Sequence, residues 1–389
     1  MANDAQRLTA TPQALLEFYL GGLRIPSFSD EEGPYARYIV AEMQRLGYDE
    51  AYIDPAGNAV GRVGDGPRVI HFDSHMDTVR VTDANAWDAP PFEGRVVNGM
   101  ACGRGSVDMK GGLSASVYAA AAAKQAGLIC GRTVYVTGSV CEEYCDGVCL
   151  EHFYRDRGLK PDYCVICEPS DNRVVLGHTG KVQARIRTHG VSAHGSAPEL
   201  GVNAVYEMAE IIARVEGLNQ TLQQTPGGGT VALTQISCES ASLNAVPSEC
   251  EIYLDRRLRF GETTKKAFCE LDALVLGKRA DWELGTLLHT SWNKKELVYR
   301  PAHEPWKIEE AHPLTKALLA AYRAALGREP GPFDFWDFGT NAVVPVSMGV
   351  PTIGFGPGEY KLAHMRNERC SLKQVEEAWE VYTRLIAML

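Results

Sequence analysis

The stretch RVIHFDSHMDTV, residues 68–79, decides the fold of this 389-residue chain. Val69, Ile70 and Phe72 in its first half are typical of a buried strand, and its second half is mainly polar. We therefore expect a strand over residues 68–75 that ends in a polar loop. His75 and Asp77 are two positions apart, so their side chains point the same way on an extended segment. The carboxylate can then orient the imidazole.

Strands and helices alternate on both sides of this segment. Helices are expected over residues 12–23 and 32–46, and over the Ala-rich residues 108–127. Short β-rich runs follow at residues 133–140 and 162–167. This order predicts an α/β domain with a mostly parallel sheet flanked by helices. Such sheets bind ligands outside the carboxyl ends of their strands.

A different pattern occupies the middle of the chain. Strands with alternating polarity and only two helices indicate an inserted α+β domain over residues 180–291. The α/β pattern then returns, with helices expected at residues 313–326 and 372–389. We therefore expect one discontinuous catalytic domain, residues 1–179 and 292–389, interrupted by the insertion.

The composition excludes several classes of protein. Lys and Arg number 39 against 49 Asp and Glu, which gives a formal charge of −10 and a pI near 5.6. Nucleic acid and membranes are therefore not expected as partners. The chain has no apolar run long enough for a membrane helix, and its start lacks the layout of a signal peptide. With 11 scattered cysteines, this predicts a cytoplasmic protein.

Acidic and imidazole side chains follow the predicted strand ends. If they converge, their like charges repel one another unless a cation lies among them. Histidine and carboxylate ligands suit zinc, cobalt or manganese, and one bridging carboxylate would allow two ions in the same site. The side chains concerned are His75, Asp77, Asp108, Glu142, Glu143, Glu168, His364 and Glu368.

Motifs such as SHMDTV (74–79), GRGSVDMKGG (103–112), VCEEY (140–144) and AHMRNE (363–368) together resemble one known family, the zinc-dependent aminoacylases, acetylornithine deacetylases and succinyl-diaminopimelate desuccinylases. The resemblance covers nearly the whole chain in the family's order. At a finer level, the spacing EPW…HPL (304–314) and the run GFGPGEYKLAHMRNE (354–368) are similar to a poorly characterised hydrolase subgroup associated with selenium-metabolism gene clusters. The motifs are SHMDTV (74–79), WDAPPFEG (87–94), GRGSVDMKGG (103–112), VCEEY (140–144), CEPS (167–170), THGVSAHGSAPELGVNA (188–204) and AHMRNE (363–368).

The resemblance implies a site with two divalent metal ions, zinc first, with cobalt or manganese as alternatives. One ion would be held by His75, Asp108 and Glu168, and the other by Asp108, Glu143 and His364. Asp108 would bridge the two ions.

The resemblance also implies roles next to the metals. Glu142 would be the general base, and Asp77 would orient His75. Relatives have a cis peptide bond after the bridging aspartate, so we expect one between Asp108 and Met109.

Further residues are implied to contact the substrate. Arg257 and Asn244 align with residues that bind the substrate's carboxylate and acyl oxygen, although the neighbouring Arg256 leaves the choice of arginine open. His194 would reach the site of a partner subunit. The implied assembly is a homodimer formed through residues 180–291, a ferredoxin-like dimerisation or lid domain beside a phosphorylase/hydrolase-like catalytic domain.

The implied activity is metal-dependent hydrolysis of the amide bond of an N-acylated amino acid, with an acetyl, succinyl or carbamoyl group. A carboxypeptidase or a di- or tripeptidase of the same family is the alternative. A non-catalytic metal-binding relative would lack the base or a ligand, and all of those positions are filled here. The acyl group is left open.

Two cysteines adjoin the expected ligands. Cys141 and Cys167 each precede a carboxylate of the expected site and would point the opposite way on an extended segment. We therefore leave both thiols out of the expected ligand set.

Overall fold

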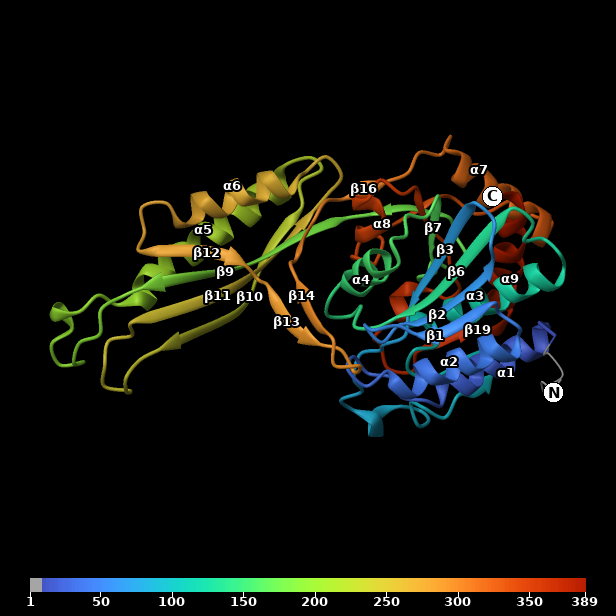
Figure 1. Ribbon diagram of the computed structural model, residues 1–389. Coiled ribbons are helices and arrows are strands. Elements are labelled where there is room, and N and C mark those ends of the chain that lie inside the picture. The colour runs from blue at the N-terminus through green and yellow to red at the C-terminus, as the bar shows by residue number, and fades with distance from the viewer. Residues whose placement is uncertain (1–8) are drawn as a thin grey trace.

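The computed structural model describes residues 9–389, so residues 1–8, which begin the expected catalytic domain, lie outside the described residues. Figure 1 shows a broad part that contains both ends of the described chain and a long, narrow part that extends from it.

A mixed nine-stranded sheet forms the base of the broad part. In order across the sheet the strands are β1 (Glu50–Ile53), β2 (Ala59–Gly64), β6 (Arg132–Ser139), β3 (Arg68–His75), β7 (Tyr163–Ile166), β18 (Thr352–Gly354), β8 (Val175–His178) and β16 (Trp306–Lys307), with β17 (Asp334–Trp336) also paired to β8. The central strands β6, β3, β7 and β18 run parallel. The expected parallel sheet is thus its centre, whereas β1, β2 and β16 pair antiparallel at the edges.

Helices cover both faces of this sheet. The helices of the broad part are α1 (Pro12–Leu23), α2 (Gly33–Arg45), α3 (Gly111–Gln125), α4 (Val148–Arg157), α7 (Pro313–Leu326), α8 (Val343–Ser347) and α9 (Leu372–Met388). Helix α1 begins where Thr11 caps it through a side-chain bond from the Ala14 N–H, followed by Pro12 at the first helical position. Helix α7 ends at Gly327, which adopts the left-handed conformation that favours glycine.

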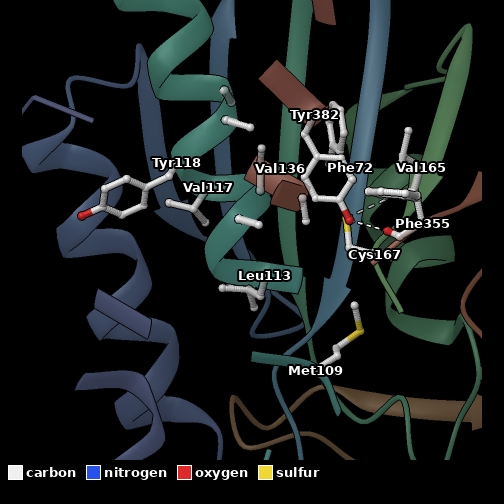
Figure 2. Close-up of a cluster of buried hydrophobic side chains, with 14 of the residues drawn as sticks. Phe72, Met109, Leu113, Val117, Tyr118, Val136, Val165, Cys167, Phe355 and Tyr382 are labelled. Carbon is white, nitrogen blue, oxygen red and sulfur yellow. Dashed lines mark hydrogen bonds between the residues drawn. The ribbon is translucent and has the colours of Figure 1, made fainter. Parts of the chain in front are cut away.

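Adjacent residues of one strand supply different cores. Val134 and Val136 of β6 join the main core, while Tyr135 between them joins a second core with side chains of α4. Figure 2 shows Leu113 and Val117 of α3 in the same buried cluster as Val136. Because side chains alternate across a strand, a sheet buried on both faces produces the nearly continuous apolar runs seen in the sequence.

The narrow part is built on a five-stranded antiparallel sheet. Its strands are β10 (Thr230–Glu239), β11 (Glu249–Leu258), β9 (Gly180–His189), β12 (Ala280–Leu284) and the short β15 (Ala302–His303), and its helices are α5 (Ala204–Gln224) and α6 (Thr264–Val275). The helices and one face of the sheet share a separate apolar core. Buried and partly exposed residues alternate along β9 and β11, as expected for a sheet covered on one face.

Two small sheets complete the molecule. The hairpin β13 (Leu287–Thr290) and β14 (Glu296–Tyr299) contributes Leu297 and Tyr299 to the main core of the broad part. A three-stranded sheet combines β4 (Arg95–Val97), β5 (Met100–Cys102) and β19 (Arg369–Ser371). Within residues 9–389, no helix has the combined length and apolarity needed to cross a membrane.

Candidate metal centre

Polar side chains gather where the central strands end. β3 ends at His75, the loop after β6 carries Glu142 and Glu143, and Glu168 lies two residues beyond β7. Because β6, β3, β7 and β18 are parallel, these ends meet at one edge of the sheet. His364 reaches the same place from the chain between β18 and β19.

Asp108 reaches this edge from an irregular turn, Ser106–Lys110. The expected helix over residues 108–127 is wrong at its start, because Asp108 and Met109 have non-helical backbone angles and α3 begins at Gly111. The peptide bond between Asp108 and Met109 is cis, so that prediction is confirmed.

A buried carboxylate, Glu368, explains the shape of this turn. It accepts hydrogen bonds from the backbone N–H groups of Gly105, Val107 and Asp108 at 3.2, 2.7 and 3.1 Å. Arg104 pairs with the same carboxylate at 2.6 Å. These contacts join segments more than 250 residues apart, which is why helix propensity alone misplaces the start of α3.

Asp108 lies between the two histidines. Its Oδ1 is 2.8 Å from His75 Nε2, and its Oδ2 is 3.2 Å from His364 Nε2. Glu168 Oε1 lies 3.6 Å from the same nitrogen of His75, and Glu143 Oε1 lies 3.0 Å from that of His364. The side chains therefore form two groups that share Asp108, as two adjacent cations would require.

The donor atoms are close enough to hold ions. His75, Asp108 and Glu143 offer atoms within 4.8 Å of one another, and so do His75, Glu142 and Glu168. Burial raises the pKa of Glu142 and of Glu168 well above the usual range. Carboxylates crowded and desolvated in this way are stabilised in their charged form by a divalent cation, so the residues present fit metal binding.

The histidines respond to the same carboxylates. Burial opposes protonation of His75, yet the charge of Glu168 and the hydrogen bond to Asp108 raise its pKa well above the usual value. Hydrogen bonds to Asp108 and Glu143 raise the pKa of His364 to about 10. The carboxylates thus favour positive charge at the positions where the cations are expected.

Asp77 makes more contacts than its expected role requires. His75 Nδ1 lies 2.9 Å from the backbone carbonyl of Asp77 and 3.5 Å from its carboxylate. That carboxylate also accepts hydrogen bonds from the backbone N–H groups of Glu142 and Glu143, each at 3.1 Å, and from Ser29 Oγ at 2.7 Å. Asp77 therefore holds both His75 and the loop with the two glutamates.

A cleft of about 340 Å³ opens over the donor atoms, and side chains of the narrow part line its other wall. Lys181 of β9 and Arg257 of β11 are cross-strand neighbours there. Lys181 Nζ lies 2.7 Å from Asp146 Oδ2 in the loop before α4. Sequence reasoning missed Lys181 and Asp146. Only the pairing of β9 with β11 places the Lys181 side chain beside Arg257, and Asp146 is recognised only through its ion pair with Lys181.

The two adjacent arginines have different surroundings. Arg256 is buried and binds Glu262 at 2.6 Å and Glu270 at 2.8 Å, so a ligand cannot reach it. The Arg257 side chain is 40% exposed, lines the cleft and pairs with Asp255 at 2.7 Å. Of the two arginines, only Arg257 is available to a substrate.

His194 and Asn244 lie together in a second pocket of about 610 Å³ in the narrow part. The N–H of Gly195 donates to the Asn244 carbonyl at 2.6 Å, and His194 Nδ1 lies 2.7 Å from Ser196 Oγ. Neither His194 nor Asn244 lines the metal cleft within one chain.

Comparisons with known proteins agree with this geometry. Residues 71–388 match the model of peptidase family M20/M25/M40. An uncharacterized protein, YgeY, of Escherichia coli (strain K12) is 39% identical over 350 residues, covering 89% of this chain and 87% of the relative. Succinyl-diaminopimelate desuccinylase 2 of Shewanella loihica is 25% identical and covers 94% of this chain and 97% of its own.

Solved structures share the fold. The metallo-carboxypeptidase Sso-CP2 of Sulfolobus solfataricus superimposes with a TM-score of 0.73 at 17% identity, covering 96% of this chain and 98% of that one. The dinuclear metal-binding peptidase YXEP of Bacillus subtilis gives a TM-score of 0.67 at 14% identity and covers 97% of each chain.

The chain belongs to peptidase family M20/M25/M40. The resemblance to the aminoacylase and desuccinylase family is confirmed, and so is the expected α/β architecture with a second α+β part. The protein is thus a hydrolase of the metallopeptidase and amidohydrolase class.

Proposed function

We propose that the protein hydrolyses the amide bond of an N-acylated amino acid at a centre of two divalent cations. The observation that carries this proposal is the position of Asp108, whose two oxygens face different histidines. His75 and Glu168 complete one ligand group, and Glu143 and His364 complete the other.

The proposed cations are zinc, with cobalt or manganese as alternatives, because the donors are imidazoles and carboxylates. When bound, they would supply Lewis-acid polarisation of the scissile carbonyl and lower the pKa of water in the cleft. Dialysis against a chelator should abolish activity, and adding back zinc, cobalt or manganese should restore it. Full activity in protein shown by elemental analysis to be metal-free would contradict the proposal.

Glu142 is the proposed general base. Its side chain is buried at the cleft, and the hydrogen bond from its backbone N–H to Asp77 fixes its loop. Burial raises the pKa of Glu142, so its carboxylate accepts a proton more readily than an exposed glutamate does. It would take a proton from the attacking water and return it to the leaving amine.

The substrate's free carboxylate is proposed to bind Arg257, since a guanidinium offers a bidentate fork to a carboxylate. A free carboxylate is present both in N-acyl amino acids and at the C-terminal end of a peptide. The desuccinylase relative, similar along nearly its full length, supports an acylated amino acid as the first choice. A carboxypeptidase or a di- or tripeptidase remains the second candidate.

A substrate screen separates these candidates. Metal-loaded enzyme should be assayed on N-acetyl, N-succinyl and N-carbamoyl amino acids and on dipeptides, with Glu142→Ala as the control for contaminating activity. The proposal expects turnover of one acyl class above that of the dipeptides. Faster turnover of dipeptides would replace the first candidate with the second.

The proposed assembly is a homodimer formed through an inserted domain of residues 180–291, with residues 1–179 and 292–389 as the catalytic domain. His194 and Asn244 would then line the cleft of the partner subunit, where His194 stabilises the oxyanion and Asn244 binds the acyl oxygen. Their shared pocket away from this chain's own cleft supports such an exchange. A cytoplasmic location is proposed because all 11 cysteines are free.

A further inference from the structure

A second group of side chains that could bind a metal ion includes Cys141, the residue before Glu142. Asp30, Cys141 and His289 each offer one atom, and these atoms lie within 4.8 Å of one another. His289 Nε2 is 2.5 Å from Asp30 Oδ1, which is 3.7 Å from Cys141 Sγ. The three residues come from the loop before α2, the loop after β6 and strand β13.

A further carboxylate, Glu32, adjoins the same sulfur atom. Its Oε1 lies 3.6 Å from Cys141 Sγ and accepts a hydrogen bond from the Cys141 N–H at 3.0 Å. Glu32 is fully buried, and among residues 9–389 no group hydrogen-bonds to its other oxygen, Oε2. A buried carboxylate with an unpartnered oxygen is costly, and a cation bound to this carboxylate would offset that cost.

Asp30 and Cys141 also share an uncommon backbone conformation. Their φ angles are +75° and +58°, in the left-handed region that non-glycine residues rarely adopt. Cys141 therefore leaves the extended path expected from the sequence, and its thiol faces the Asp30 and Glu32 carboxylates.

We propose that Asp30, Cys141 and His289 bind a third divalent cation, with Glu32 as an additional oxygen donor. Ligand atoms bound tetrahedrally to zinc at about 2.0–2.3 Å are roughly 3.3–3.8 Å apart, and the two sulfur–oxygen distances already fall in this range. One sulfur, one imidazole and carboxylate oxygens select zinc or cobalt over magnesium and calcium, which prefer oxygen ligands alone.

The proposed site is open to solvent on one side, and an ion bound there would connect two segments of the chain. The side chains of Asp30 and His289 are 40% and 19% exposed, whereas Cys141 is buried. A cation here would link the β13–β14 hairpin to the loop that holds Glu142 and Glu143. On binding, the contact between Asp30 and His289 opens, and the thiol proton is released to the solvent.

Cobalt substitution tests the site without an activity assay. Protein loaded with Co²⁺ should hold three ions per chain and show the near-ultraviolet charge-transfer band of a cobalt–thiolate bond. The ligands proposed for the dinuclear centre contain no sulfur, so that centre does not contribute to this band. Cys141→Ser should lose the band and one ion, while Cys145→Ser, a buried cysteine in the same loop, should keep both.

Two further variants complete the experiment. His289→Ala should lose the same ion and band, and it keeps the test valid if Cys141→Ser does not fold. Asp108→Asn should disturb the other two ions and leave the band, which separates this proposal from that of the dinuclear centre. Wild-type protein without the band, or a folded Cys141→Ser that retains it, would overturn the third site.

Discussion

At the scale of single residues, adjacent side chains have different surroundings. Glu142 and Glu143 both attach through their N–H groups to Asp77, but only Glu143 is hydrogen-bonded to His364, at 3.0 Å. Arg256 and Arg257 differ in the same way, one enclosed by carboxylates and one open to the cleft. Each pair allows a matched comparison of two neighbouring variants.

Replacing Glu142 with Gln should preserve both metals and lower kcat by about 10²–10⁴-fold, because the variant lacks the proton acceptor but keeps the proposed ligands. Glu143→Gln should instead lower the metal content. Elemental analysis and kcat measured on both variants test this assignment. Metal loss in Glu142→Gln with retention in Glu143→Gln would reverse it.

Arg257→Ala should raise KM for substrates with a free carboxylate more than for the corresponding amides, since the amides cannot use the guanidinium fork. Arg256→Ala should instead lower the free energy of unfolding by about 3–5 kcal/mol, because it leaves Glu262 and Glu270 without their buried partner. Steady-state kinetics and urea unfolding on both variants separate binding from stability. Equal KM changes for acids and amides would reject the role of Arg257.

At the scale of elements, a buried histidine ties three of them together. His71 of β3 contacts Thr137 Oγ1 of β6 at 2.8 Å and Tyr154 of α4 at 2.6 Å. Burial lowers the pKa of His71 to about 3, so the ring is neutral in the folded protein at neutral pH. In the unfolded chain the same ring takes up a proton near pH 6.5.

Stability should therefore fall as the pH is lowered from about 6.5 toward 3, because the unfolded state then binds a proton that the folded state does not. The expected contribution of His71 approaches about 1.4 kcal/mol per pH unit within this range. Urea unfolding of wild type and His71→Gln at several pH values measures it, with the exposed His194→Gln as control. The His71→Gln profile should be flatter, and parallel profiles would refute the prediction.

At the scale of the whole molecule, two pockets that are both proposed to bind the substrate lie apart within one chain. The cleft over the proposed metal ligands lies between the broad and the narrow parts, while His194 and Asn244 occupy a separate pocket in the narrow part. A two-fold dimer that exchanges these pockets would make each active site from two chains.

Mixing of inactive subunits tests this exchange. Glu142→Ala and His194→Ala should each be nearly inactive, since one lacks the base and the other the oxyanion donor. After co-refolding, about half of the dimers would be mixed and carry one intact site, so roughly a quarter of wild-type activity should return. If His194 served its own chain, mixing would restore nothing.

The local sequence determined the elements and the chemistry that they carry. The strand expected at residues 68–75 is β3, and the expected helices at residues 12–23 and 313–326 are α1 and α7 as predicted. These features depend on periodicity and capping between near neighbours in the chain. The motifs at the strand ends likewise identified the family.

Only the tertiary structure decided how distant side chains meet. It turned the two oxygens of Asp108 toward different histidines, enclosed Arg256 while exposing Arg257, and brought Cys141 to Asp30 and His289. The start of α3 also depends on Glu368, more than 250 residues away. Such contacts are determined by the packing of whole elements. Patterns among residues that are adjacent in sequence therefore do not predict them.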